Sequence, residues 1–157
     1  MKQFLKFSGF IAFGLALLGF ILFMATPAIT YEGHTAAEGA TAIFGKQGNL
    51  VDAKPSVLAL IAWILILAGM ILLAFMIIMM FVKKDFYGKF ANLFNVILAI
   101  AFILAAILSF FTVPTFFSAN GGGNSDGFVL GAGWIIGAIL VILACCLCLL
   151  PVVLKKK

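Results

Sequence analysis

The sequence predicts an all-α integral membrane protein, an up-down bundle of four transmembrane helices with both ends of the chain in the cytoplasm. The first observation behind this prediction is composition, because 66% of the 157 residues are hydrophobic and only 10% are charged. A soluble domain carries about a quarter charged residues, so a soluble fold would expose apolar surface that this chain could not cover. The other two observations are four long apolar stretches and the distribution of the lysines.

The four apolar stretches run over residues 7–25, 57–82, 90–113 and 128–153, and none of them contains an acidic, basic or histidine residue. A helix that crosses the hydrocarbon core of a bilayer needs about 20 apolar residues, so we expect one helix in each stretch. Membrane strands would be about ten residues long with alternating polarity, which these stretches lack. We therefore expect a single membrane domain over 1–157, with outer loops at 28–54 and 115–127 and an inner turn at 83–89.

The lysines predict the orientation. Eight of the ten lie in the N-terminal flank, the turn at 83–89 or the C-terminal tail, where Asp85 is the only acid. The outer loops hold Lys46 and Lys54 against four acids. Because lysine is retained on the cytoplasmic side during insertion, we expect a multi-pass protein of the cell membrane with both termini cytoplasmic. The net charge of +5 then reflects topology, and no basic face with interleaved aromatics indicates a nucleic-acid partner.

Two interpretations of the first stretch are open. The basic start and apolar run are shared with cleaved signal peptides, but the run is longer than the 7–15 residues typical of a signal peptide. The exit at residues 25–28 gives no clean small-x-small cleavage site. We favour a retained helix. The chain also lacks arginine, which disfavours bidentate phosphate or carboxylate sites and suggests an AT-rich bacterial source.

The first outer loop predicts a small β-hairpin, with strands at 41–44 and 49–51 around a turn at 45–48. A lone hairpin is marginally stable in water, so it would need to pack on the helix ends or on a partner. The glycine-rich stretch 120–127 in the second outer loop is typical of a flexible connector, and its spacing matches no calcium-binding loop. Pro114 is expected to end the third helix.

Small residues recur four apart on the first and fourth expected helices. Such residues let two membrane helices approach closely. We favour packing of these two helices within one chain, and the alternative is self-association between chains. The helix-packing candidates are Ser8, Ala12, Ala16, Gly127, Gly131, Gly133 and Gly137.

The third stretch carries a seam of polar and small or aromatic residues at alternating spacings of three and four, which places them on one face of a helix: Asn92, Asn95, Ala99, Phe102, Ala106 and Ser109. We favour an interhelical clamp near the cytoplasmic end, because amide side chains in lipid need hydrogen-bond partners. The alternative is the polar lining of a pore. The candidates for this polar seam are Asn92, Asn95, Ser109 and Thr112.

No set of residues predicts catalysis, a metal site or a cofactor site. Cys145, Cys146 and Cys148 lie in an apolar run, where packing is favoured over redox chemistry. His34 has Glu32 and Glu38 nearby, but zinc usually needs three or four ligands, so we interpret it as a solvated loop histidine. Ionisable groups at membrane depth, which proton relays and ion-coupled carriers use, are also missing. We therefore expect neither an enzyme nor a secondary transporter, and no small-molecule substrate.

The leading hypothesis is a non-enzymatic membrane protein that acts through helix packing and its outer loop as a structural, assembly or regulatory component of a membrane complex. Its expected partners are membrane lipid and either a second copy or a partner membrane protein. The alternative is a homo-oligomeric pore, a channel or holin-like permeabiliser, lined by helix three. A third hypothesis is a quinone-linked thiol protein.

In topology alone, two outer loops around a short inner turn resemble claudin-like and other tetraspan proteins. The tryptophan- and cysteine-containing motif of the claudin outer loop is absent, so no residue is carried over and no family is assigned.

Overall fold

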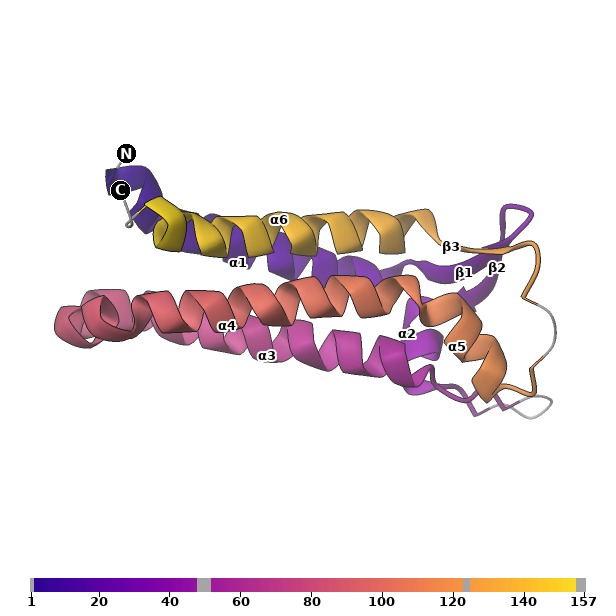
Figure 1. Cartoon of the computed structure of the whole chain (residues 1–157). Coiled ribbons are helices and arrows are strands. Elements are labelled where there is room, and N and C mark those ends of the chain that lie inside the picture. The colour runs from indigo at the N-terminus through magenta and orange to yellow at the C-terminus, as the bar shows by residue number, and fades with distance from the viewer. Residues whose placement is uncertain (1, 48–51, 123–124, 155–157) are drawn as a thin grey trace.

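The computed structural model describes residues 2–47, 52–122 and 125–154. The described chain is mostly helical, with a small antiparallel sheet (Figure 1). In chain order its elements are α1 (Lys2–Ala25), β1 (Pro27–Tyr31), β2 (His34–Glu38), α2 (Gly39–Phe44), α3 (Val57–Val82), α4 (Lys84–Phe110), α5 (Thr112–Ala119), β3 (Phe128–Leu130) and α6 (Ala132–Leu154).

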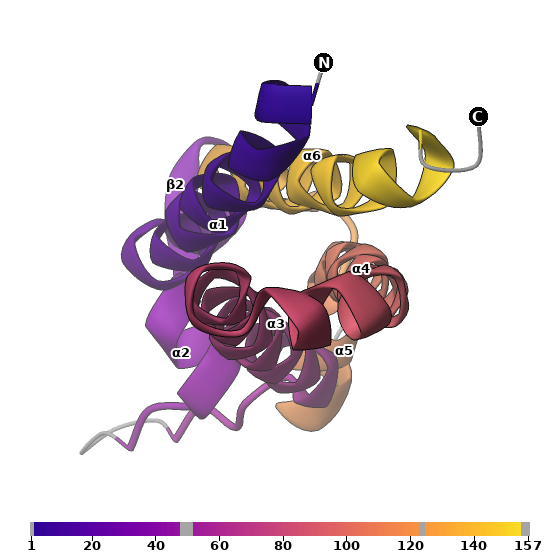
Figure 2. The same ribbon diagram turned by 90° about the vertical axis from the view of Figure 1, so that its left-hand side faces the viewer.

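Four of these helices, α1, α3, α4 and α6, are long and apolar enough to span a membrane. The start of α1, the end of α6 and the turn between α3 and α4 lie together at what we call the terminal end (Figure 1). The strands, α2 and α5 lie at the opposite end and form what we call the sheet-end domain. Figure 2, which looks onto the terminal end, shows α1 beside α6 and α3 beside α4. The most extensive helix contacts are α1 with α6, α3 with α4, and α4 with α6.

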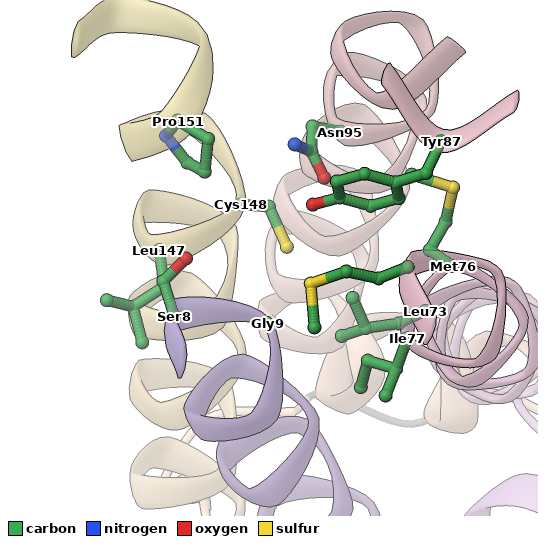
Figure 3. Close-up of a pocket in the computed structure, with 11 residues that line it drawn as sticks. Ser8, Gly9, Leu73, Met76, Ile77, Tyr87, Asn95, Leu147, Cys148 and Pro151 are labelled. Carbon is green, nitrogen blue, oxygen red and sulfur yellow. The ribbon is translucent and has the colours of Figure 1, made fainter. Parts of the chain in front are cut away.

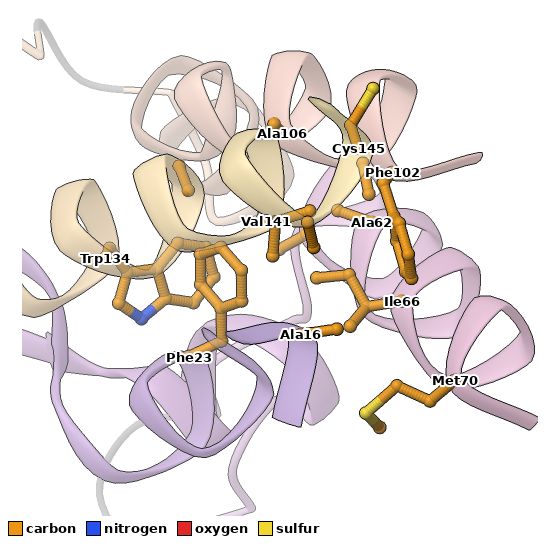
Figure 4. Close-up of a cluster of buried hydrophobic side chains, with 14 of the residues drawn as sticks. Ala16, Phe23, Ala62, Ile66, Met70, Phe102, Ala106, Trp134, Val141 and Cys145 are labelled. Carbon is orange, nitrogen blue, oxygen red and sulfur yellow. The ribbon is translucent and has the colours of Figure 1, made fainter. Parts of the chain in front are cut away.

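The space between the four helices is filled by their own side chains. Ala16, Ile66, Phe102 and Val141 come from the four different helices and are almost completely buried (Figure 4). Phe102 lies flat against the α3 backbone at Gly69, where an added methyl group would come within 2.6 Å of the ring. Close packing of this kind replaces the hydrophobic drive that is missing between helices in lipid.

The sheet has the order β2-β1-β3, with β1 in the centre and both pairings antiparallel. Glu32 and Gly33 connect β1 to β2, and both have positive φ, 48° and 82°. Two central residues with positive φ give the type I′ turn, whose twist matches that of a hairpin. On the other side of β1, Ile29 pairs with Leu130. This pairing connects the end of α1 directly to the start of α6.

Three glycines hold the sheet-end domain against the segment where α1 ends. Gly39 starts α2, Gly131 lies between β3 and α6, and Gly133 is in the first turn of α6. A Cβ atom at Gly39 or Gly131 would overlap a backbone carbonyl oxygen of that segment, and one at Gly133 would overlap the Thr26 side chain. We call these three residues the glycine collar.

Two backbone hydrogen bonds depend on the close approach that the glycine collar permits. The Gly39 N–H donates to the Thr26 carbonyl at 2.9 Å, and the Gly131 N–H donates to the Ala28 carbonyl at 2.9 Å. The Thr26 hydroxyl donates to the Leu22 carbonyl at 2.6 Å, which is the usual way for threonine to satisfy its polar group in an apolar helix. The last turn of α1 is thereby bonded to α2 and to the segment preceding α6.

The predicted hairpin is misplaced. The sheet-end domain does contain a hairpin, but residues 27–38 form it, and the predicted strand at 41–44 is part of α2. Propensity does not explain the helix at 39–44, which contains strand-forming threonine, isoleucine and phenylalanine, but β1 is already paired with the strand that immediately follows it. The predicted returning strand at 49–51 lies outside the described residues, next to a single antiparallel bridge between Lys46 and Ala53.

The third and fourth helices also differ from their expected bounds. The turn predicted at 83–89 is helical, because the chain reverses at Lys83 alone and α4 starts at Lys84. Pro114 does not end this helix. It lies in the first turn of α5, where its missing N–H costs no helical hydrogen bond, and α4 ends at Phe110. The fourth helix starts at Ala132, since residues 128–130 pair with β1 as β3.

Replacing Gly131 or Gly39 with alanine is expected to destabilise the fold by about 1–3 kcal/mol, because overpacking forces the backbone apart. Thermal unfolding of the purified full chain in detergent, followed by loss of helical circular dichroism, measures this effect. Gly14→Ala is the matched control, since nothing lies within 4 Å of a Cβ atom added there. An equal loss of stability in all three variants would contradict the role of the collar.

Candidate interaction surfaces

Two polar contacts tie the second loop of the sheet-end domain to the segment before α3. The Asn120 amide group accepts a hydrogen bond from the Lys54 N–H at 2.6 Å and donates one to the Lys54 carbonyl at 2.9 Å. It also donates to the Phe116 carbonyl at 2.8 Å. The Ser56 and Thr115 hydroxyl oxygens lie 2.6 Å apart. Asn120 thus pairs with Lys54 as a neighbouring strand would, and residues far apart in the sequence form one domain.

An aromatic chain runs through the same domain. The Phe128 ring of β3 lies 4.8 Å from Tyr31 of β1 and 4.5 Å from Phe117 of α5, measured between ring centroids. On the other side, Trp63 of α3 contacts Phe20 at 5.2 Å and Phe44 of α2 at 5.0 Å. These contacts give the sheet-end domain its own apolar support on top of the helices.

The surface of this domain is polar, with isolated apolar groups. Four of the five residues of β2 are exposed, and Val129 of β3 is 58% exposed. Glu32, His34 and Glu38 lie along the hairpin and are exposed. No group of three or more His, Cys, Asp or Glu residues capable of holding a metal occurs among the described residues.

The structure places most of the helix-packing candidates between α1 and α6 of one chain. Ser8, Ala12, Ala16 and Gly137 are buried there. The closest approach involves Gly19, where an added Cβ atom would lie 3.0 Å from the Gly137 carbonyl oxygen.

The remaining candidates act differently from the prediction. Gly127 and Gly131 precede α6 and are not on a helix face. Gly127 has a φ of 84° and packs under the Tyr31 ring, while Gly131 and Gly133 belong to the glycine collar. Of the two four-residue pairs, Gly133 and Gly137 lie within α6, whereas Gly127 and Gly131 lie in the segment before it.

The predicted polar seam is only partly on one buried face. Asn95 and Ser109 are buried in α4, Asn92 is exposed, and Thr112 is buried but belongs to α5. Ser109 donates its hydroxyl hydrogen bond to the Ala106 carbonyl at 2.7 Å, within its own helix. The Thr112 hydroxyl, like the indole N–H groups of the two tryptophans, has no hydrogen-bond partner among the described residues.

A small cavity lies beside Asn95 at the terminal end (Figure 3). Its volume of about 20 Å³ is enough for one water molecule. Polar groups of Ser8, Tyr87, Asn95 and Cys148 line it together with methionine and leucine side chains. One water molecule in this cavity can hydrogen-bond to these polar groups, and the cavity is too small for a metabolite.

The three cysteines are free thiols on different faces of α6. Cys145 and Cys148 are buried and Cys146 is exposed. The Cys145 thiol donates a hydrogen bond to the Ala99 carbonyl of α4 at 3.3 Å. Cys145 is therefore part of the α4–α6 contact.

The structural roles of Gly39, Gly69 and Asn120 were not predicted from the sequence. A lone glycine next to a strand carries no spacing pattern, and the partner of Asn120 is 66 residues away in the chain. The glutamate-glycine pair at 32–33, flanked by β-branched and aromatic residues, is a signal that points to the hairpin that forms.

Comparison with known proteins found no matching family model, no matching curated protein and no matching solved structure.

Asn120→Ala is expected to release the segment before α3, at a cost of about 0.5–1.5 kcal/mol, because it removes three exposed hydrogen bonds whose backbone groups then bond to water. Hydrogen–deuterium exchange should then speed up in residues 52–56 without a change in α4. Ser118→Ala, an exposed position on the same short helix, is the control. Unchanged exchange at residues 52–56 in Asn120→Ala would contradict the contact.

A thiol reagent applied to the folded chain in detergent is expected to label Cys146 at least tenfold faster than the two buried cysteines. Intact mass spectrometry follows the number of labels, and Cys146→Ser should remove the fast one. Similar labelling rates for all three thiols would contradict the placement of Cys145 and Cys148 in the core.

Proposed function

We propose that the chain is a small, non-enzymatic, multi-pass protein of the cell membrane that serves as a structural, assembly or regulatory component of a membrane complex. It binds a partner membrane protein or a second copy of itself through the sheet-end domain. The observation that carries this proposal is that the described residues of both loops, which are separated by two long helices, form one folded domain with exposed polar residues. A domain with this much order is more than is needed to connect helices.

The helical region supports a role without chemistry of its own. Its centre is filled by alanine, isoleucine, phenylalanine and valine side chains, and the polar cavity beside Asn95 holds about one water molecule. The close packing of α1 against α6 supports retention of α1 as a membrane helix. The lysines at the terminal end support a cytoplasmic location for both termini, which places the sheet-end domain outside.

A homo-oligomeric pore lined by α4 is less well supported. Asn95 and Ser109 face the interior of their own bundle, so α4 would have to turn its buried face outward to line a shared lumen. We expect the purified protein to conduct no ions in planar bilayers. Steady conductance that Asn95→Leu alters would favour the pore instead.

Crosslinking in native membranes tests the proposal. A photoreactive amino acid at Thr35 or Val129, both exposed on the sheet-end domain, is expected to give discrete crosslinked species. The same group at Ile100, which is 59% exposed on the apolar face of α4, should give none. Two differently tagged copies distinguish self-association from binding to another protein.

The crosslinks should also weaken in Asn120→Ala, because the proposed surface requires the folded domain. Monomers alone at both sheet-end positions, or equal crosslinking from Ile100, would remove the basis of the proposal.

A further inference from the structure

In the sequence, most of the lysines belong to the segments that start α1, join α3 to α4 or follow α6. Lys83 forms the turn between α3 and α4, and Lys83 and Lys89 are exposed. Asp85 is the only acid in this part of the sequence, so eight lysines against one aspartate leave seven positive charges in excess. Lysines 155–157 follow α6 in the sequence and lie outside the described residues. The lysines concerned are Lys2, Lys6, Lys83, Lys84, Lys89, Lys155, Lys156 and Lys157.

The turn that presents the exposed lysines is held by aromatic side chains. Phe86 of α4 lies 4.9 Å from Phe90 and 6.4 Å from Phe75 of α3, measured between ring centroids. The Lys89 ammonium group lies 5.6 Å from the centre of the Phe90 ring, within the range of a cation–π contact. Lys89, in the second turn of α4, therefore lies against an aromatic cluster that joins α4 to α3.

Exposed apolar groups lie directly beside the charge. Phe81 and Val82, the last residues of α3, are 65% and 68% exposed. Together with Lys83, Asp85 and Phe86 they line an open cleft beside the turn. A cationic group next to apolar surface at the end of a membrane helix matches a lipid, whose phosphate and acyl chain are joined in the same molecule.

We propose that the terminal end binds anionic phospholipid, with the phosphate at the lysines of the α3–α4 turn and the acyl chain along Phe81 and Val82. Lysine acts as a point charge toward phosphate, and basic residues next to a membrane helix attract anionic headgroups. A zwitterionic headgroup carries its own cation, which these lysines repel. This lipid binding is separate from the effect of lysine on membrane insertion, because the binding should still be measurable with the purified, folded protein. It is independent of the proposed binding at the sheet-end domain.

The test uses the purified full chain in neutral detergent, titrated with phosphatidylglycerol or phosphatidylcholine and followed by native mass spectrometry. Phosphatidylglycerol is expected to bind at least tenfold more tightly, with an affinity that falls as salt screens the charges. Lys83→Gln with Lys89→Gln should weaken it by about fivefold for each lysine. Asp85→Asn should strengthen it severalfold, since it removes the only acid beside the turn.

Lys46→Gln with Lys54→Gln is the matched control, because it removes the same charge from the sheet-end domain and should leave lipid binding unchanged. Circular dichroism of each variant checks that the helices are intact. The gain expected for Asp85→Asn cannot arise from unfolding. Equal binding of the two lipids, an equal loss in the two lysine pairs, or weaker binding in Asp85→Asn would each overturn the proposal.

Discussion

The close approach of backbones where α1 ends is the constraint on which the rest of the structure depends. The glycine collar brings α2, β3 and the start of α6 onto this one segment without intervening side chains. Ordinary residues at these positions would separate the elements by at least the width of a methyl group. The sheet, the hydrogen bonds of Gly39 and Gly131, and the angle at which α6 meets α1 all require that contact.

The two ends of the bundle present different kinds of surface. At the sheet end, the hydrogen bonds of Asn120 hold together a domain with exposed polar residues, the surface that we propose binds a protein partner. At the terminal end, a turn packed by aromatic side chains lies beside exposed apolar groups and lysines, where we propose that a lipid binds. The packed region between them separates these two surfaces.

Features that repeat along the sequence could be predicted from it, whereas contacts between single residues far apart in the chain could not. The four apolar stretches show where helices form, and the small residues Ala12, Ala16 and Gly137 indicate the contact between α1 and α6. Residues 128–130 were expected in a helix because they are apolar, but pairing with β1 outweighs that preference. This pairing depends on a strand about 100 residues earlier, which no local pattern contains. For the same reason the contact between Asn120 and Lys54 has no signal in the sequence.

The central position of β1 has a consequence for how the protein is made. β1 and β2 can form their hairpin as soon as they leave the ribosome, whereas β3 and α6 are synthesised about 100 residues later. Until then one edge of β1 lacks a neighbour, and the small-residue face of α1 is open to lipid or to other chains. Synthesis of β3 and α6 therefore supplies both the missing strand of the sheet and the helix that packs on α1. A chain halted before that point would have an unpaired strand edge beside an open helix face.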